Sequence, residues 1–118
     1  MVMKLRFFHL LQVANVSLPL SVVVKADDFD VSVLQDKLLQ GGAAEGAVAT
    51  FTGYVRSSNE NRNVHCLELE HYPGMTEKSL MAIENQTRQK WKVSDIRIIH
   101  RYGKLEINEQ IVLVAVSS

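Results

Sequence analysis

The fold is decided by residues 46–56, which read Gly46-Ala-Val-Ala-Thr-Phe-Thr-Gly-Tyr-Val-Arg56. Odd-numbered positions from Ala47 to Val55 face one way and even-numbered positions from Val48 to Arg56 face the other, because side chains alternate across a strand. The stretch therefore predicts a β-strand with Arg56 at its exit.

A polar segment, residues 57–63, follows this strand and has no periodicity, so we expect a loop there. Residues 64–71 form a second predicted strand, which Pro73-Gly74 brings to an end. We predict that the strands on either side of the loop pair as a hairpin.

Helical spacing indicates one helix on each side of this strand pair. Upstream, a short strand at Val22–Val24 leads to acidic capping candidates in residues 27–30, and Gly41-Gly42 ends the helix that follows. Downstream, Thr76 can cap a helix whose apolar residues reach Trp91, with cations in its last turn.

The last run, Ile111 to Val116, is apolar on both faces, as in a central strand covered on both sides. Residues 96–99 form another strand before it. The order strand, helix, strand, strand, helix, strand, strand predicts a single-domain α+β fold with two helices and a mixed, largely antiparallel sheet. Two helices can cover one face of this sheet, so we expect the other face to be covered by a segment beyond Ser118 or by another subunit.

The composition is that of an ordinary globular domain. The chain has 118 residues, 47% hydrophobic and 22% charged, and its 13 Lys+Arg equal its 13 Asp+Glu, which fits one domain and favours no nucleic-acid partner. Cys66 is the only cysteine in the sequence, so an internal disulfide and a zinc site built on several cysteines are excluded. We therefore expect a reducing compartment, the cytoplasm.

Residues 1–20 could be read as a secretory signal, because Lys4 and Arg6 precede an apolar-leaning stretch that runs to Val24. Polar residues interrupt that stretch, no small-residue cleavage site follows, and it is too polar to cross a membrane. We instead expect an N-terminal extension or a leading strand in residues 1–20, a domain in residues 21–118, and no membrane partner.

Three stretches match one known family in the same order and with similar spacing. They are Gly46 to Arg56, then Leu69-Glu-His-Tyr-Pro-Gly-Met-Thr-Glu-Lys78, then Ile99-His-Arg-Tyr-Gly103, and the second is the most specific. On these residues the chain resembles the large, catalytic subunit of molybdopterin synthase. The resemblance covers roughly residues 22–118 and leaves the N-terminal extension outside.

The resemblance implies a sulfur transferase of molybdenum cofactor biosynthesis. Such enzymes are heterotetramers: a dimer of large subunits, each bound by a small ubiquitin-like subunit whose Gly-Gly end carries a thiocarboxylate. That tail enters a pocket on the large subunit and delivers sulfur, in two rounds, to a cyclic pterin monophosphate, which becomes molybdopterin with its dithiolene. No metal and no dissociable cofactor is implied for this step.

The resemblance also places a substrate-contacting tripeptide on Tyr54, Val55 and Arg56. A pocket for an anionic phosphate needs fixed cations and exclusion of water, and Arg56 is the best candidate for such a cation. The alternation puts Tyr54 on the same strand face, so we expect an aromatic surface beside the guanidinium. Relatives often carry Lys at the position of Tyr54.

The family's catalytic residues have no match within this sequence. In the family the last strand continues into a Ser-Ala-His-Arg element, a helix and a Lys-rich segment with two reactive lysines, so we identify no catalytic residue and expect those lysines beyond Ser118. Lys78 and Lys104 do not match them by position and are typical of solvated lysines. The alternative function is a catalytically inactive assembly module that dimerises or binds the small subunit. An unrelated α+β ligand-binding domain ranks last.

The other candidate residues have structural interpretations as well. Cys66 could carry sulfur, but two glutamates share its strand face and would raise a thiol pKa. His71 and His100 lie in the matched stretches and could be acids or bases, or hydrogen-bonded structural histidines. A zinc site from His65, Cys66 and His71 is disfavoured because Cys66 points away from the histidines, so we predict no metal.

Overall fold

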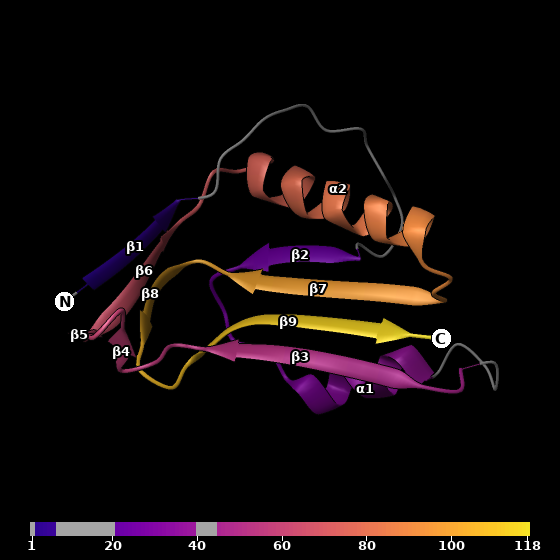
Figure 1. Ribbon diagram of the computed structural model, residues 1–118, viewed down its shortest axis with the longest axis horizontal. Coiled ribbons are helices and arrows are strands. Elements are labelled where there is room, and N and C mark those ends of the chain that lie inside the picture. The colour runs from indigo at the N-terminus through magenta and orange to yellow at the C-terminus, as the bar shows by residue number, and fades with distance from the viewer. Residues whose placement is uncertain (1, 7–20, 40–44) are drawn as a thin grey trace.

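The structure, a computed structural model, describes residues 2–6, 21–39 and 45–118 of the chain. In chain order its elements are β1 (Val2–Arg6), β2 (Val22–Lys25), α1 (Val31–Leu39), β3 (Val48–Tyr54), β4 (Ser58–Asn59), β5 (Arg62–Asn63), β6 (Cys66–Glu70), α2 (Met75–Lys90), β7 (Asp95–Arg101), β8 (Gly103–Glu106) and β9 (Gln110–Ser117). Figure 1 shows these helices and strands in one domain, and the predicted α+β class is confirmed. The predicted helix end at Gly41-Gly42 lies outside the described residues.

A four-stranded sheet in the order β2-β7-β9-β3 forms the centre of the molecule. β2 runs parallel to β7, whereas β9 is antiparallel to both β7 and β3. The last apolar run is therefore a central strand, as the sequence predicts. Two of its side chains, Leu113 and Ala115, are completely buried.

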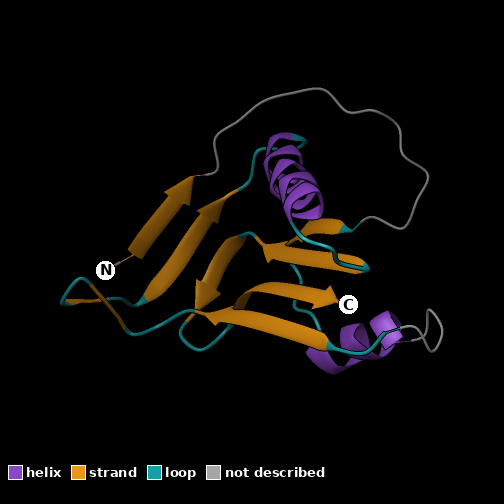
Figure 2. Ribbon diagram, turned by 45° about the vertical axis from the view of Figure 1, so that its right-hand side comes forward, coloured by secondary structure: helices purple, strands orange, loops and turns teal. Residues whose placement is uncertain are grey.

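The two helices lie on opposite faces of this sheet, so the prediction that both cover one face is wrong (Figure 2). Leu80 of α2 packs on the face that carries Ile96 and Ile98, while Leu34 of α1 packs on the face that carries Ile99. The reason is the period of two in β7: consecutive isoleucines point to opposite faces, and each face needs its own apolar cover.

On the α2 face, the described residues leave part of the apolar surface of the central sheet uncovered. α2 contacts β2 at one edge of the sheet, and on the far edge Phe51 of β3 is 65% exposed. Between them, Val112, Val114 and Val116 of β9 are only half-buried. The uncovered apolar surface that the sequence predicts thus belongs to the α2 face of β9 and β3.

A second sheet has the order β1-β6-β8, and the predicted hairpin between residues 46–56 and 64–71 is wrong. β3 pairs with β9, whereas β6 pairs with β1 in parallel and with β8 in antiparallel register. β1 therefore places a leading strand within residues 1–20, beside strands of the domain. The sequence did not predict β8.

Residues 57–63 are also more regular than the loop we expected. β4 and β5 pair Ser58 with Asn63 and form a tight hairpin. Its two turn residues, Glu60 and Asn61, have φ of 52° and 62°, the left-handed values that two-residue hairpin turns require. This hairpin carries the chain from the end of β3 into the second sheet.

The helix starts follow local capping rules. The Asp30 carboxylate accepts a hydrogen bond from the Val33 amide at 3.2 Å, which fixes the start of α1 among the predicted acidic candidates. At α2 the Glu77 carboxylate accepts from the Gly74 amide at 2.9 Å, and Gly74 has a φ of 83°. The predicted cap Thr76 is instead buried inside the first turn. Within the described residues neither helix combines the length and apolarity needed to cross a bilayer.

The buried centre of β9 gives a direct test of the fold. Leu113→Ala is expected to lower the free energy of unfolding by about 2–5 kcal/mol, because it leaves a cavity between the sheet and α1. Leu39→Ala, the same deletion at a side chain that is 52% exposed, should cost less than about 0.5 kcal/mol. Urea denaturation of both variants checks this, and equal losses would contradict the layer arrangement.

Candidate functional site

The predicted site residues Tyr54, Val55 and Arg56 lie at a β-bulge where β3 leaves the central sheet. Gly53 pairs with Val112, but Tyr54 pairs with Gln110, so β9 has one extra residue at this point. A Cβ on Gly53 would lie 2.9 Å from Val112 Cγ1, so a larger residue at position 53 would clash with the Val112 side chain unless that side chain moved.

Val55 anchors the segment after the bulge. Its side chain is 3% exposed and packs with Leu67, Leu69 and Leu105. Its amide donates to the Glu109 carbonyl at 3.0 Å, and its own carbonyl accepts from the Asn108 amide at 2.8 Å. Because Val55 points into the core, the residues on either side of it point outward.

Tyr54 and Arg56 are accordingly exposed, and Tyr54 retains 54% of its accessible surface. The alternation of exposed, buried and exposed side chains follows the pattern that the sequence predicts. Val55 itself cannot present its side chain to a ligand. The segment thus exposes an aromatic residue and an arginine on either side of one buried valine.

Arg101, the last residue of β7, holds the turn at residues 106–109 that bonds to Val55. Its side chain is only 8% exposed, and its Nη2 lies 3.6 Å from the Glu109 carboxylate. Nη1 donates to the Gln110 carbonyl at 2.9 Å, and Nε donates to the Ala26 carbonyl at 3.1 Å. One buried guanidinium therefore joins the end of β2 to the start of β9.

Gln110 extends the same network toward α1. Its Nε2 donates to the Asp28 carboxylate and to the Phe29 carbonyl, both at 2.8 Å. The hydrogen bond from Gln110, the one from the Phe29 amide and the charge of Arg101 lower the pKa of Asp28 below its ordinary 3.8. Asp28 is thus an anion at neutral pH, next to the Arg101 cation.

The three matched stretches meet in this region. Val55 comes from the first stretch and Leu69 from the second, and Tyr102 of the third packs against the same apolar cluster. His71 stacks on Tyr102 with ring centroids 4.2 Å apart, and its Nε2 lies 3.9 Å from Glu77. His71 thus packs beside the cluster that anchors the site segment, and its Nδ1 is buried with no hydrogen-bond partner in the described part of the chain.

His100 lies on the α2 face of the central sheet, opposite Val112. Its Nδ1 is 2.8 Å from the Arg101 carbonyl, which can only accept, so Nδ1 carries the proton. Burial lowers the pKa of His100 below its ordinary 6.5, against a smaller effect of that hydrogen bond. A neutral, hydrogen-bonded imidazole fits the structural interpretation of His100.

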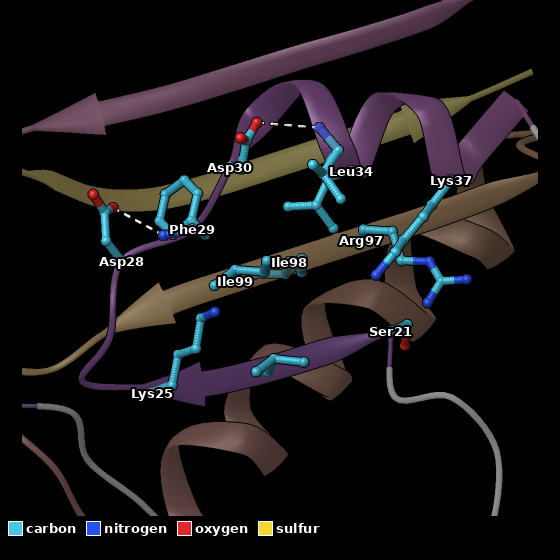
Figure 3. A pocket seen from close by; sticks show the side chains of 12 residues that line it. Ser21, Lys25, Asp28, Phe29, Asp30, Leu34, Lys37, Arg97, Ile98 and Ile99 are labelled. Atoms are coloured by element: carbon cyan, nitrogen blue, oxygen red, sulfur yellow. Dashed lines mark hydrogen bonds between the residues drawn. The ribbon is translucent and has the colours of Figure 1, made fainter.

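A separate hollow of about 380 Å³ lies between α1, β2 and β7, and none of Tyr54, Val55 and Arg56 lines it. Figure 3 shows Phe29 and Leu34 on the α1 side of this hollow and Ile99 on β7. Lys25, Lys37 and Arg97 also line it. Its positive charge is partly neutralised, because Arg97 Nε lies 3.1 Å from the Asp95 carboxylate and two aspartates line the other end.

The other candidate residues lie elsewhere. Cys66 is buried in β6, and the described residues contain no cluster of three His, Cys, Asp or Glu side chains that could hold a metal ion. Lys78 is exposed in the first turn of α2. Lys104 is 68% exposed, with Nζ 4.0 Å from Glu106. Both lysines have the surface positions that the sequence favours.

The sequence alone did not single out Arg101 as a residue that supports the site. Alternation in β7 puts it on the same face as Ile99, and an arginine on an apolar strand face needs buried acceptors. The acceptors come from residue 26, which is 75 positions away in the sequence, and from residue 110 across the turn after β8, so only the tertiary structure reveals them.

Comparisons with known proteins identify the family of this chain. The family described as MoaE protein matches residues 24–118. The chain belongs to the MoaE family. A curated relative from Vibrio cholerae, named molybdopterin synthase catalytic subunit, is 50% identical over 97 residues, covering 82% of this chain and 64% of the relative.

Solved structures of the MoaE family have the same fold. Molybdopterin cofactor biosynthesis protein E from Burkholderia multivorans has a TM-score of 0.72 and 44% identity, covering 82% of this chain and 62% of that one. Molybdopterin synthase from Staphylococcus aureus has a TM-score of 0.71 and 33% identity, covering 83% of this chain and 70% of that one. The chain thus spans less than two thirds of the length of the first curated relative.

The bulge gives a testable prediction for this MoaE-family chain. Gly53→Ala is expected to cost about 1–3 kcal/mol of stability, because the new methyl group meets the stiff Val112 side chain. Gly53→Ala with Val112→Ala should cost less than the sum of the two single losses. Gly46→Ala, whose Cβ would have only an ordinary contact at 3.7 Å, is the matched control. Additive losses in the double variant would contradict the close approach.

His100 gives a pH prediction. Since its pKa is lower in the folded state, the unfolded state binds more protons below about pH 6.5, and the free energy of unfolding falls as pH decreases. His100→Gln is expected to flatten the dependence between about pH 7 and 5, whereas the same change at the exposed His65 should leave it. Denaturant titrations at several pH values check this, and an unchanged slope in His100→Gln would refute it.

Proposed function

We propose that this chain is the substrate-binding part of a molybdopterin synthase large subunit. Membership of the MoaE family and the name molybdopterin synthase catalytic subunit carried by the relatives support this. The enzyme would transfer sulfur from the thiocarboxylated end of a small ubiquitin-like subunit to a cyclic pterin monophosphate, in the cytoplasm. Each transfer would break the carbon–sulfur bond of the thiocarboxylate, whose acyl carbon takes oxygen and ends as a carboxylate, and would form a carbon–sulfur bond on the pterin side chain in place of a carbon–oxygen bond.

The observation that carries the proposal is the outward pair Tyr54 and Arg56 on a segment fixed by the buried Val55. Arg56 would bind the phosphate of the substrate through charge-assisted hydrogen bonds. Tyr54 would offer its ring to the flat pterin, since aromatic faces stack with planar ring systems. Val55 would contribute by position alone, because its side chain belongs to the core.

The partners follow from the same family. We propose that two such chains form a dimer and that each binds one small subunit, whose thiocarboxylate tail would reach the pterin held beside Arg56. The alternative, an inactive assembly module, shares these partners and lacks turnover. The inactive module is supported by the exposed positions of Lys78 and Lys104, because neither lysine provides a buried amine for the chemistry.

Arg56→Ala tests the proposed substrate site. Loss of a charge-assisted contact to the phosphate is expected to weaken binding of the cyclic pterin monophosphate by about 1.5–3 kcal/mol, or about 10- to 150-fold in Kd, measured by calorimetry. Arg97→Ala, which removes a guanidinium from the separate hollow, is the matched control and should keep the affinity of the unsubstituted chain.

The reverse result, a loss in Arg97→Ala and none in Arg56→Ala, would move the substrate to the hollow between α1, β2 and β7 and overturn the proposed site. Dithiolene formation with thiocarboxylated small subunit then separates the enzyme from the assembly module. Substrate binding without any turnover would favour the module.

A further inference from the structure

Arg101 has an unusual position for a charged residue. Its alternation partner on β7 is the buried Ile99, and its own side chain is 8% exposed. A buried guanidinium is costly unless its donors are satisfied, and here Nε and Nη1 both donate to backbone carbonyls. The carboxylates of Asp28 and Glu109 lie 3.8 and 3.6 Å from its Nη atoms and balance its charge.

The segment that Arg101 holds is the one on which the site residues rest. Glu109 and Gln110 are contacted by Arg101 on one side, and on the other side they pair with Val55 and Tyr54. One backbone hydrogen bond, from the Val55 amide to the Glu109 carbonyl at 3.0 Å, links the two sides. Arg101 is thus connected to the outward pair through a single layer of backbone.

Other bonds also fix this turn, and in one of them the Glu109 carboxylate accepts from the Glu106 amide. The Asn108 amide bonds to the Val55 carbonyl, and the Glu109 amide donates to the Glu106 carbonyl at 3.1 Å. Asn108 has a φ of 72°, a left-handed conformation that asparagine tolerates better than most residues, so the turn is tight at this point. Two side chains tie the start of β9 to the segment after β2: the Arg101 guanidinium bonds to the Ala26 and Gln110 carbonyls, and the Gln110 amide bonds to Asp28 and Phe29.

We propose that Arg101 is a positioning residue for the substrate site: through Glu109 and Gln110 it fixes the bulge after Gly53 and so sets Tyr54 and Arg56 side by side. The identity of the ligand rests on the proposed function, whereas the geometry around Arg101 does not depend on it. Arg101 touches no substrate, because its donors are bonded to the protein. Lysine cannot replace it, since one ammonium cannot copy the planar fork that reaches Ala26 and Gln110 together.

The test combines Arg101→Lys with Arg56→Ala. Arg101→Lys is expected to weaken binding of the cyclic pterin monophosphate by about 10- to 100-fold, because small displacements of binding groups have effects of this size. In a double-mutant cycle the second substitution should add little, since Arg101 acts through Arg56. Additive losses, or an unchanged affinity in Arg101→Lys, would overturn the inference.

A control separates positioning from general loss of stability. Ile96→Ala removes a buried side chain at the other end of β7 and should lower stability while leaving substrate affinity within about twofold. An equal loss of affinity in Ile96→Ala would show that any destabilised variant binds poorly, and Arg101 would have no special role.

Amide hydrogen exchange tests the geometry without substrate. The Val55 and Asn108 amides should exchange at least about tenfold faster in Arg101→Lys than global stability alone explains, and Ile96→Ala should show no such excess. Gln110→Ala, which removes the bonds to Asp28 and Phe29 but keeps the backbone, should give a smaller excess and serves if Arg101→Lys does not fold. Unchanged local exchange overturns the inference, whereas unchanged affinity in Arg56→Ala overturns the proposed function.

Discussion

One buried cation, the Arg101 guanidinium, connects the end of β2 directly to the start of β9, two strands that do not pair with each other. Its Nε donates to the carbonyl of Ala26 after β2, and its Nη1 donates to that of Gln110 at the start of β9. It also lies beside the carboxylates of Asp28 and Glu109. Removing it would leave the Ala26 and Gln110 carbonyls without this donor and would take the cation away from the two carboxylates. The shape of the outer surface at Tyr54 and Arg56 depends on this constraint.

The central sheet supplies the frame in which that constraint works. β9 is a central strand with one face sealed by α1, so Leu113 and Ala115 are fully buried and the strand cannot shift. β3 lies along it until Gly53, where the close approach to Val112 is followed by the bulge. From there the chain leaves for the second sheet, and Val55 is the last residue of the segment that the core holds.

Much of this could be predicted from local patterns. Alternation in residues 46–56 predicted β3 and the exposed positions of Tyr54 and Arg56. The run that is apolar on both faces identified β9 as a central strand. Both patterns depend only on which side chains follow one another in the sequence. Strand partners could not be predicted: residues 57–63 have no apolar pattern, yet Glu60 and Asn61 adopt left-handed conformations and redirect the chain away from β3. The role of Arg101 was equally hidden, since its acceptors are backbone carbonyls, which every residue has. Among the site residues, the sequence named Arg56 by resemblance, and the structure adds what holds it.

The central claim is that an anionic pterin binds at the outward pair and not in the hollow that contains Lys25, Lys37 and Arg97. Nitrogen-detected NMR of the arginine side chains during titration with the cyclic pterin monophosphate tests this most directly, because each guanidinium reports its own surroundings. The Arg56 Nε signal is expected to move with saturation, while the signals of Arg97 and the buried Arg101 should stay within a small fraction of that change. Movement at Arg97 with a stationary Arg56 signal would contradict the central claim.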